Sequence, residues 1–428
     1  MPEMDSPENP IQAATPTNLI DQHVAVESSR TECCLEHLWW AGASTMAAAC
    51  GRSLWTRLMG PNGPRLFPNL YIILVSEPGQ GKTLAVRTAA ARFAEMKIHT
   101  AADSITASKL LSWTAVASEK RIEEGRDPGL VMALENLESL FSRKADSSLK
   151  AFLAAAYDCK DEYTQDTQIR GKEPIKNLCL NLIAAATPSH LASCFQASDW
   201  AEGLASRFLL ILGTPSRIGE LPPFDPVMAA AHGTAIQDFR NGLGKGVEVG
   251  WTPEAWASRL SWRRSQGKTL PPHPHASGYW HGRHILLAKL AMLQAVAAQE
   301  DSISSTAWDG ALAALATMEL GLPTALASTG GNPFAGILAS VIRWAFAEGR
   351  VLDEWEIRAR LADFISPQYV QAAMDGMLAA RQLVEVVGAA GPAASPHRRL
   401  IHPQLKAPGA KIWEIAKVRA GGAGGAAR

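Results

Sequence analysis

The sequence predicts an α/β fold in which helices flank a parallel β-sheet. Three observations favour this fold class. Four continuous apolar runs have the length and composition of buried parallel strands. Segments of helical periodicity separate these runs, and strands that alternate with helices form layered α/β structures. A glycine-rich turn joins the first run to a helix-like segment, which is typical of a phosphate-binding loop.

The composition is that of an ordinary globular protein. The 428 residues are 47% hydrophobic and 19% charged, which excludes a disordered or fibrous chain. Lysine plus arginine and aspartate plus glutamate each total 41, so the formal net charge is zero. Proteins that coat nucleic acid are usually basic, so any such contact must be local. No apolar run reaches the ~18 residues of a membrane span, and the polar, acidic N-terminus is unlike a signal peptide. We therefore expect no membrane contact and a cytoplasmic location.

The predicted elements follow in order along the chain. The four strands are 70–75, 130–134, 178–186 and 208–212. Two long helical patterns follow them, at 284–299 and 306–320. Beyond the segment ASTGGNP come three more helical patterns and then the short strands LVEVV and RRLIH. Three helices followed by a two-stranded ribbon are the layout of a winged helix.

The most specific motif is SEPGQGKT, which follows the first strand and precedes a helix. It fits the P-loop pattern GxxxxGK[ST], with Ser76 in place of the first glycine. Its glycines let the backbone bend around a phosphate, so that N–H groups point inward at a helix N-terminus. Lys82 would reach the β- and γ-phosphates, and the Thr83 hydroxyl would ligate Mg²⁺. The motif predicts binding of ATP or GTP with Mg²⁺, ATP being the favoured nucleotide. The predicted contacts come from Glu77, Pro78, Gly79, Gln80, Gly81, Lys82, Thr83 and Leu84.

A second motif follows the strand 130–134. Nucleotide hydrolysis requires a group that holds Mg²⁺ and a carboxylate that orients water, and the usual pair at this position is Asp-Glu. Here Glu135 can serve the metal directly or through water, whereas Asn136 can orient the water but cannot accept its proton. Glu138 can substitute as the carboxylate. The alternative interpretation is that these side chains merely begin a helix.

Two further segments, AAATPSH (184–190) and GLASRFLLIL (203–212), resemble motifs of the AAA+ ATPases. Within them the sequence is similar to the minichromosome maintenance-type helicases and to related phage and plasmid replication ATPases. The resemblance implies that Thr187 is the sensor-1 residue and that Arg207 is an arginine finger that reaches a neighbouring subunit. It also implies that Arg283, in GRHILLAKLA, is the sensor-2 arginine of a helical lid. An ordinary structural role for Arg207 stays open.

The resemblance covers about residues 66–405 and implies a ring, expected to be a hexamer. It departs from the family pattern at Ser76 and at the Glu135-Asn136 pair. The domain organisation that follows is a flexible tail (1–30), a helical prefix (31–65), an AAA+ core (66–232), a helical lid with sensor 2 (233–326), a linker (327–334), a winged helix (335–405) and a basic flexible tail (406–428).

A basic hairpin is expected between the second motif and sensor 1. Polar alternation on both sides of Arg170-Gly171-Lys172 favours two short strands with a charged tip. In the helicases that the chain resembles, the corresponding hairpin contacts DNA in the ring channel. We therefore expect Arg170, Lys172 and, lower down, Lys176 to bind single-stranded DNA, with a solvated charged turn as the alternative.

Other metal sites are not favoured by the sequence. The six cysteines contain no Cys-x-x-Cys pair and suggest buried, reduced thiols rather than disulfides or zinc. Four histidines gather in PPHPHASGYWHGRH, but prolines surround them and no cysteine is near. A loop at the entry to the lid is the favoured interpretation of that segment.

The leading functional hypothesis is an ATP-driven DNA translocase or helicase of a phage or mobile element. One alternative is a helicase loader or initiator that uses ATP as a switch on a protein partner, such as a primase or helicase. The other is a scaffold that binds nucleotide only to assemble. Slow hydrolysis at Glu135-Asn136 would suit the switch. The winged helix has few basic residues, so it suits contact with protein as well as with DNA.

Overall fold

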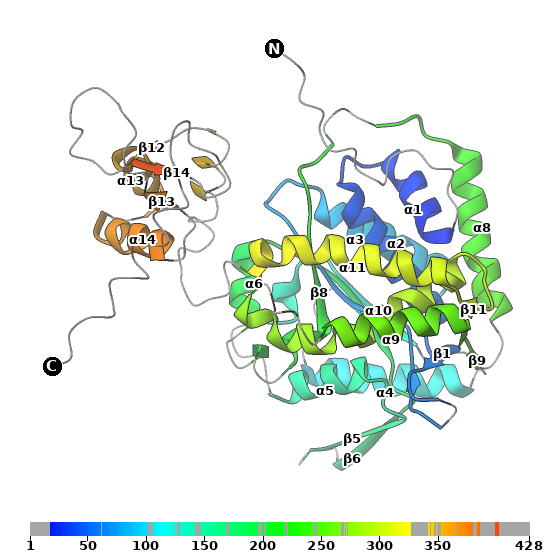
Figure 1. Ribbon diagram of the computed structural model, residues 1–428. Coiled ribbons are helices and arrows are strands. Elements are labelled where there is room, and N and C mark those ends of the chain that lie inside the picture. Colours follow the sequence, from blue (N-terminus) through cyan, green and yellow to red (C-terminus); the bar gives the residue numbers. More distant parts are fainter. Residues whose placement is uncertain are drawn as a thin grey trace. The chain divides into compact units, whose positions relative to one another are not determined.

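The computed structural model divides into two compact units, Met1–Thr329 and Gly330–Arg428 (Figure 1). Their boundary falls inside the linker expected at 327–334. The structure describes residues 18–60, 62–101, 105, 107–123, 125, 129–141, 147–167, 171–195, 199–200, 203–217, 219, 221–243, 246–266, 269, 271, 273–326, 341–342, 344–345, 348, 352–365, 367–379, 383–385 and 399–401. The tail expected at 406–428 lies outside them.

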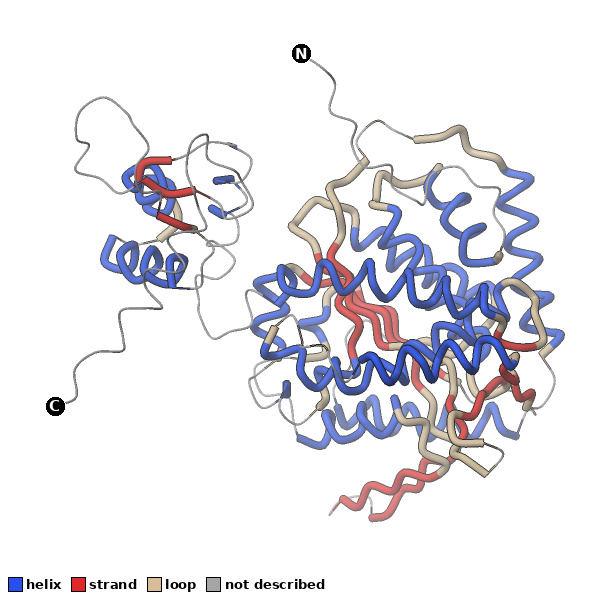
Figure 2. The backbone as a smooth tube through the Cα atoms, in the orientation of Figure 1, coloured by secondary structure: helices blue, strands red, loops and turns tan. Residues whose placement is uncertain are grey.

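A four-stranded parallel sheet forms the centre of the first unit, as the apolar runs predict. Its strands are β3 (Tyr71–Val75), β4 (Leu130–Leu134), β7 (Leu180–Ala186) and β8 (Phe208–Leu212). Their order is β4-β7-β3-β8, and the side chains are buried along nearly the whole length of each strand. Figure 2 shows the strands side by side with helices around them. The predicted α/β class with a helix-flanked parallel sheet is thus confirmed.

Ten α-helices of the first unit have described bounds. They are α1 (Leu19–Ser28), α2 (Leu35–Cys50), α3 (Lys82–Glu95), α4 (Ala107–Glu123), α5 (Ser147–Tyr157), α6 (Pro188–Cys194), α8 (Pro226–Gly242), α9 (Pro253–Gln266), α10 (Ser277–Ala297) and α11 (Ser305–Leu326). Three short 3₁₀ helices accompany them, η1 (Leu137–Ser139), η2 (Ala205–Arg207) and η3 (Pro274–Ala276). Both long helical patterns expected after the sheet are therefore helices.

Small strands lie around the central sheet. The strands β1 (Leu54–Arg57), β2 (Arg65–Leu66) and β9 (Val247–Glu248) form one group, and β10 (Gly250–Trp251) pairs with β11 (Ser302–Ile303). The strands β5 (Glu162–Thr167) and β6 (Gly171–Lys176) pair as an antiparallel hairpin. Figure 1 shows this hairpin extending from the body of the unit.

The prediction of a flexible tail over residues 1–30 is wrong from Leu19 onward. Residues 19–28 form helix α1, whose N-terminus is capped by the Asn18 side chain through the N–H groups of Ile20 and Asp21. Leu19, Ile20 and other apolar side chains of α1 are buried against α2 and α8. The polar composition of residues 1–18 hid this helix from the sequence analysis, and polar side chains such as His23 and Glu27 are buried in it beside the apolar ones.

The helices expected as a lid share one hydrophobic core with the sheet. The expected boundary between the core and the lid, after residue 232, falls inside α8. Helices α10 and α11 pack against each other, and α11 packs along β8. The buried Lys289 of α10 donates hydrogen bonds to the carbonyl and side-chain oxygens of Asn69, at 2.9 and 2.8 Å, directly before β3. The core cluster accordingly includes residues of the prefix, the sheet and the presumed lid.

The second unit contains two described helices, α13 (Glu354–Ala362) and α14 (Pro367–Ala379), and a small antiparallel sheet. Its strands are β12 (Leu352–Asp353), β13 (Val384–Glu385) and β14 (Arg399–Ile401), in the order β12-β14-β13. The two segments expected to form a ribbon therefore do pair, as Val384 lies opposite Ile401. The first of the three expected helices lies mostly outside the described residues.

None of the described helices combines the length and the apolar character needed to cross a membrane.

Candidate nucleotide-binding site

The glycine loop lies at the carboxyl end of β3 and leads directly into α3. Gly79 and Gly81 have positive φ angles of 82° and 75°, a backbone conformation that side chains with a Cβ rarely adopt. At Gly81 space is also short, because an added Cβ would lie 3.2 Å from Cα of Cys33. The first N–H groups of α3 have no acceptor within the helix, so this backbone is suited to an anion.

Ser76 is accommodated without backbone strain. It is not among the described residues with positive φ, so the usual first glycine is not required here. Its N–H donates to the carbonyl of Ala186 at 3.3 Å, which ties the start of the loop to the end of β7. Farther along, the Gln80 side-chain oxygen accepts hydrogen bonds from the N–H and hydroxyl of Ser216, at 2.8 and 3.0 Å. The loop is therefore held by the end of β7 and by the segment that follows β8.

Lys82 begins α3 and lies on the loop itself. Its ammonium donates to the carbonyl oxygen of Glu77 at 3.2 Å. Partial burial lowers the pKa of Lys82, and the nearby Glu77 carboxylate opposes this effect. Thr83 follows in the first turn, and Leu84 is largely exposed. The loop therefore offers a cation and a hydroxyl beside a run of backbone N–H groups.

The order of the strands brings three predicted elements to one edge of the sheet. Strand β7 lies between β3 and β4, with Val75 opposite Ala186 and Leu134 opposite Ala184. The carboxyl ends of these parallel strands therefore place the glycine loop, Thr187 and Glu135 in a row. Ligands of open parallel sheets bind at this edge.

Glu135 has a partner that the sequence did not suggest. The guanidinium of Arg87, in the second turn of α3, donates to both carboxylate oxygens of Glu135 at 2.6 and 2.8 Å. This interaction lowers the pKa of Glu135 and keeps it ionised. Both side chains are exposed, and ion pairs of this kind are weak in water. A divalent cation can therefore compete with Arg87 for the carboxylate.

The side chains of Asn136 and Thr187 both act as helix caps. The Asn136 oxygen accepts from the N–H of Glu138 at 3.0 Å, at the start of η1. The Thr187 hydroxyl accepts from the N–H of His190 at 3.2 Å, at the start of α6. Glu138 is exposed, and its carboxylate lies 3.9 Å from Nε2 of His190. The Thr187 hydroxyl also lies 3.0 Å from that of Ser189, so it keeps polar contacts at the sheet edge.

Arg207 lies at the amino ends of the parallel strands, whereas the glycine loop lies at their carboxyl ends. It directly precedes β8, whose first residue, Phe208, is paired with Tyr71 at the start of β3. Five residues of strand, roughly 15 Å, therefore separate Arg207 from the loop. Its guanidinium is bound within the chain, to Asp158 at 2.8 Å and to the carbonyl of Gly203 at 2.8 Å. The side chain is 26% exposed.

Arg283 lies in a buried polar cluster. Its guanidinium donates to the carboxylate of Glu319 at 3.1 and 3.2 Å, and the ring of Trp280 stacks on it. Tyr279 donates to the same carboxylate at 2.9 Å. These contacts join α10 to α11. The structure therefore brings Glu135 and Thr187 to the glycine loop, whereas it places Arg207 and Arg283 in other contacts.

The expected basic hairpin is present as strands β5 and β6. Lys176 lies at its base opposite Glu162, and its side chain is exposed. Lys172 is placed near the tip by its backbone, opposite Asp166. Arg170 lies outside the described residues. The base is anchored by the buried Ile175.

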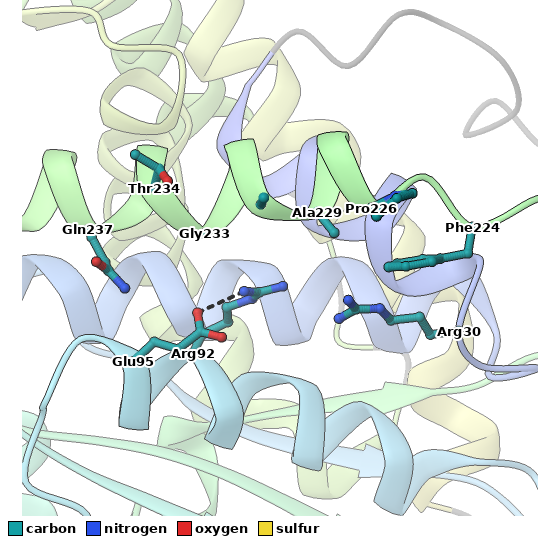
Figure 3. A pocket seen from close by; sticks show the side chains of 10 residues that line it. Arg30, Arg92, Glu95, Phe224, Pro226, Ala229, Gly233, Thr234 and Gln237 are labelled. Atoms are coloured by element: carbon teal, nitrogen blue, oxygen red, sulfur yellow. Dashed lines mark hydrogen bonds and ion pairs between the residues drawn. The ribbon is translucent and has the colours of Figure 1, made fainter.

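A separate hollow of about 530 Å³ lies between α3 and α8 (Figure 3). Its arginines are engaged by neighbouring groups. Arg92 donates to Glu27 at 2.9 Å and to Glu95 at 2.7 Å, and Arg30 lies over the ring of Phe224. None of the predicted nucleotide contacts lines this hollow.

Sequence reasoning missed Arg87 and Ser216. Arg87 lies four residues after Thr83, so the helical repeat places it one turn from the loop on the same face, and this spacing was a usable signal. Ser216 had no local signal, because its role depends on the approach of a segment 136 residues away from Gln80.

The fold and the site together define an α/β protein with a parallel central sheet and a glycine loop between strand β3 of that sheet and helix α3. No model of a known protein family matches the chain. A search of curated proteins likewise returns no match.

Proposed function

We propose that this chain is a P-loop ATPase of the AAA+ type that acts on DNA in the replication of a phage or mobile element. One observation carries the proposal. The glycine loop, with Gly79 and Gly81 at positive φ, lies beside Thr187 and Glu135 at the carboxyl edge of three adjacent strands. This arrangement offers backbone N–H groups, a lysine, a hydroxyl and two strand-end polar groups to one triphosphate.

Each of these groups has a distinct task in the proposed site. The N–H groups of the loop and Lys82 hold the phosphates, and Thr83 and Glu135 hold Mg²⁺ when it is bound. Mg²⁺ would neutralise part of the phosphate charge when bound. Thr187 contacts the γ-phosphate or the attacking water. Glu135 is suited to the metal rather than to proton transfer, because Arg87 stabilises its ionised form.

The ring, the lid and the winged helix belong to the same proposal. Arg207 lies at the amino end of β8, away from its own loop, and this position supports a role in the site of another subunit. Helices α10 and α11 would act as the lid with Arg283 as sensor 2, and residues 335–405 as the winged helix. The β5–β6 hairpin would present positive charge to single-stranded DNA, concentrated in a ring by repetition.

A switch that hydrolyses ATP slowly, such as a loader acting on a helicase or primase, is the second candidate. The observation that favours it is the state of the three groups that hydrolysis requires. Asn136 is engaged as a cap, Glu135 is paired with Arg87, and Arg207 is paired with Asp158. A partner that released these contacts would switch hydrolysis on.

Steady-state ATP hydrolysis with and without single-stranded DNA separates these candidates. A translocase should be strongly stimulated by DNA, whereas a loader should respond mainly to its protein partner. A scaffold should bind ATP and show almost no turnover. Absence of ATP binding in the wild-type chain would contradict the whole proposal.

Asn136→Glu should raise the rate of hydrolysis about tenfold or more, because it provides a carboxylate beside the attacking water. Asn136→Gln is the matched control, since it also loses the cap on η1 but adds no carboxylate. The turnover of both variants should be measured at saturating ATP. Equal rates in the two variants, with loss of activity in Glu138→Gln, would transfer the role to Glu138.

Replacing both Arg170 and Lys172 by alanine should weaken binding of single-stranded DNA and flatten its salt dependence. Each lost phosphate contact lowers the slope of log K against log salt by about 0.7. Lys176→Ala is the control at the base of the hairpin and should change the slope less. Fluorescence anisotropy over a salt series measures DNA binding by the wild type, the double variant and Lys176→Ala. An unchanged slope in the double variant would make the hairpin a solvated turn.

A further inference from the structure

A cluster of two cysteines and a histidine lies behind the glycine loop. Cys33 and Cys34 directly precede α2, and His37 is in its first turn. Each offers one ligating atom, and the three atoms lie within 4.8 Å of one another. In the part of the chain that the structure describes, this is the one such group of three or more metal-ligating side chains. All three residues are buried, with at most 1% of their surface exposed.

The chemistry of the cluster suits a metal ion better than a packed core. The two thiols come from adjacent residues, and both are buried beside the imidazole of His37. Nε2 of His37 lies 3.2 Å from the carbonyl oxygen of Ile211. Nδ1 is buried and has no hydrogen-bond partner. A histidine whose one ring nitrogen binds a backbone carbonyl keeps the lone pair of the other for a metal.

The cluster packs against the segment that follows β8, through Arg217 and Gly213. Arg217 donates to the carbonyl oxygens of Cys33, Thr31 and Ser28 at 3.1, 2.8 and 2.9 Å, which fixes the segment before α2. Gly213 leaves room for the imidazole, since a Cβ there would lie 2.5 Å from the ring. The site is therefore supported by segments that are distant in the sequence.

We propose that Cys33, Cys34 and His37 bind a Zn²⁺-like d-block cation as a structural metal site. Two sulfur ligands of tetrahedral Zn²⁺ lie about 3.8 Å apart, given a Zn–S distance of ~2.3 Å, so only a small contraction of the cluster is required. The half-buried Glu36 carboxylate, which accepts from Thr214 at 3.0 Å, lies outside this group of three and would have to shift to take the fourth position. Each cysteine releases its proton to solvent as its bond to the metal forms.

The buried position makes the ion structural rather than catalytic, since no open face remains for a substrate. It would join the start of α2 to the glycine loop, because Cα of Cys33 lies against Gly81. Binding would therefore stabilise the folded chain. Binding of the metal would not require ATP hydrolysis.

The test uses the full chain, reduced and freed of metal, without a histidine tag. Titration with Co²⁺ should give a thiolate-to-cobalt charge-transfer band that saturates at one equivalent, and Zn²⁺ should abolish the band. Zn²⁺ should also raise the melting temperature. In Cys33→Ser/Cys34→Ser the band and the thermal shift should be lost. Cys159→Ser/Cys179→Ser, which removes another buried pair of neighbouring cysteines, should retain both.

Three results would overturn the proposal. The first is a wild-type chain that gives no thiolate–cobalt band, a result that does not depend on the folding of any variant. The second is a band of wild-type strength in Cys33→Ser/Cys34→Ser. The third is loss of the band only in the control variant. Circular dichroism of the variants distinguishes loss of ligands from loss of fold.

Discussion

Lys82→Ala should weaken ATP binding about 10²-fold or more. The ammonium is the one lysine charge that the loop offers to the triphosphate, and hydrogen bonds to charged groups contribute about 1.5–3 kcal/mol each. Two such bonds, to the β- and γ-phosphates, would be lost together. The fold should be retained, because the Lys82 ammonium donates to a backbone carbonyl of the loop itself, that of Glu77, in an exposed hydrogen bond. Binding of a fluorescent ATP analogue measures the effect.

Lys120→Ala is a matched control for this variant. Lys120 is an exposed lysine in the last turn of α4, so the same charge is removed elsewhere. Its ATP affinity should equal that of the wild type. Undiminished binding by Lys82→Ala would remove the assignment of the glycine loop as a nucleotide site.

Arg207→Ala should bind ATP normally and lose about 10³-fold in the rate of hydrolysis if Arg207 is a finger for a neighbouring subunit. Binding is unaffected because Arg207 is remote from its own loop. The control is Asp158→Asn, which removes the ion pair but keeps the guanidinium. A finger released in this way should hydrolyse ATP at least as fast as the wild type. If Arg207 is structural, both variants should instead lose stability and activity together.

Mixing of variants tests whether Arg207 acts between subunits. Lys82→Ala subunits still offer an arginine, and Arg207→Ala subunits still bind nucleotide, so neither should be active alone. In mixed rings an intact loop meets an intact Arg207 at some interfaces, and part of the activity should return. A mixture that stays inactive, with assembly shown by light scattering, would contradict independent sites completed between subunits. Normal hydrolysis by Arg207→Ala alone would exclude the finger.

Local pattern determined the elements whose positions restrict the residue type. The four strands were predictable because a strand buried on both faces must be apolar throughout, as in β4 and β8. The glycine loop was predictable for a similar reason, since the positive φ angles at Gly79 and Gly81 restrict the residue type. Helix α1 was missed because half of its residues are polar, and some of these, such as His23 and Glu27, are buried through distant partners.

Only the tertiary structure decided which of these elements meet. The position of β7 between β3 and β4 brings Glu135 and Thr187 to the loop, and strand order is set by packing of whole layers rather than by local sequence. The same holds for side-chain partners. Asp158 binds Arg207, which is 49 residues away in the sequence. The imidazole of His37 packs against Gly213, a distant residue that has no side chain to obstruct it. Such contacts depend on the closing of long loops around a common core, and no periodicity in the chain encodes them.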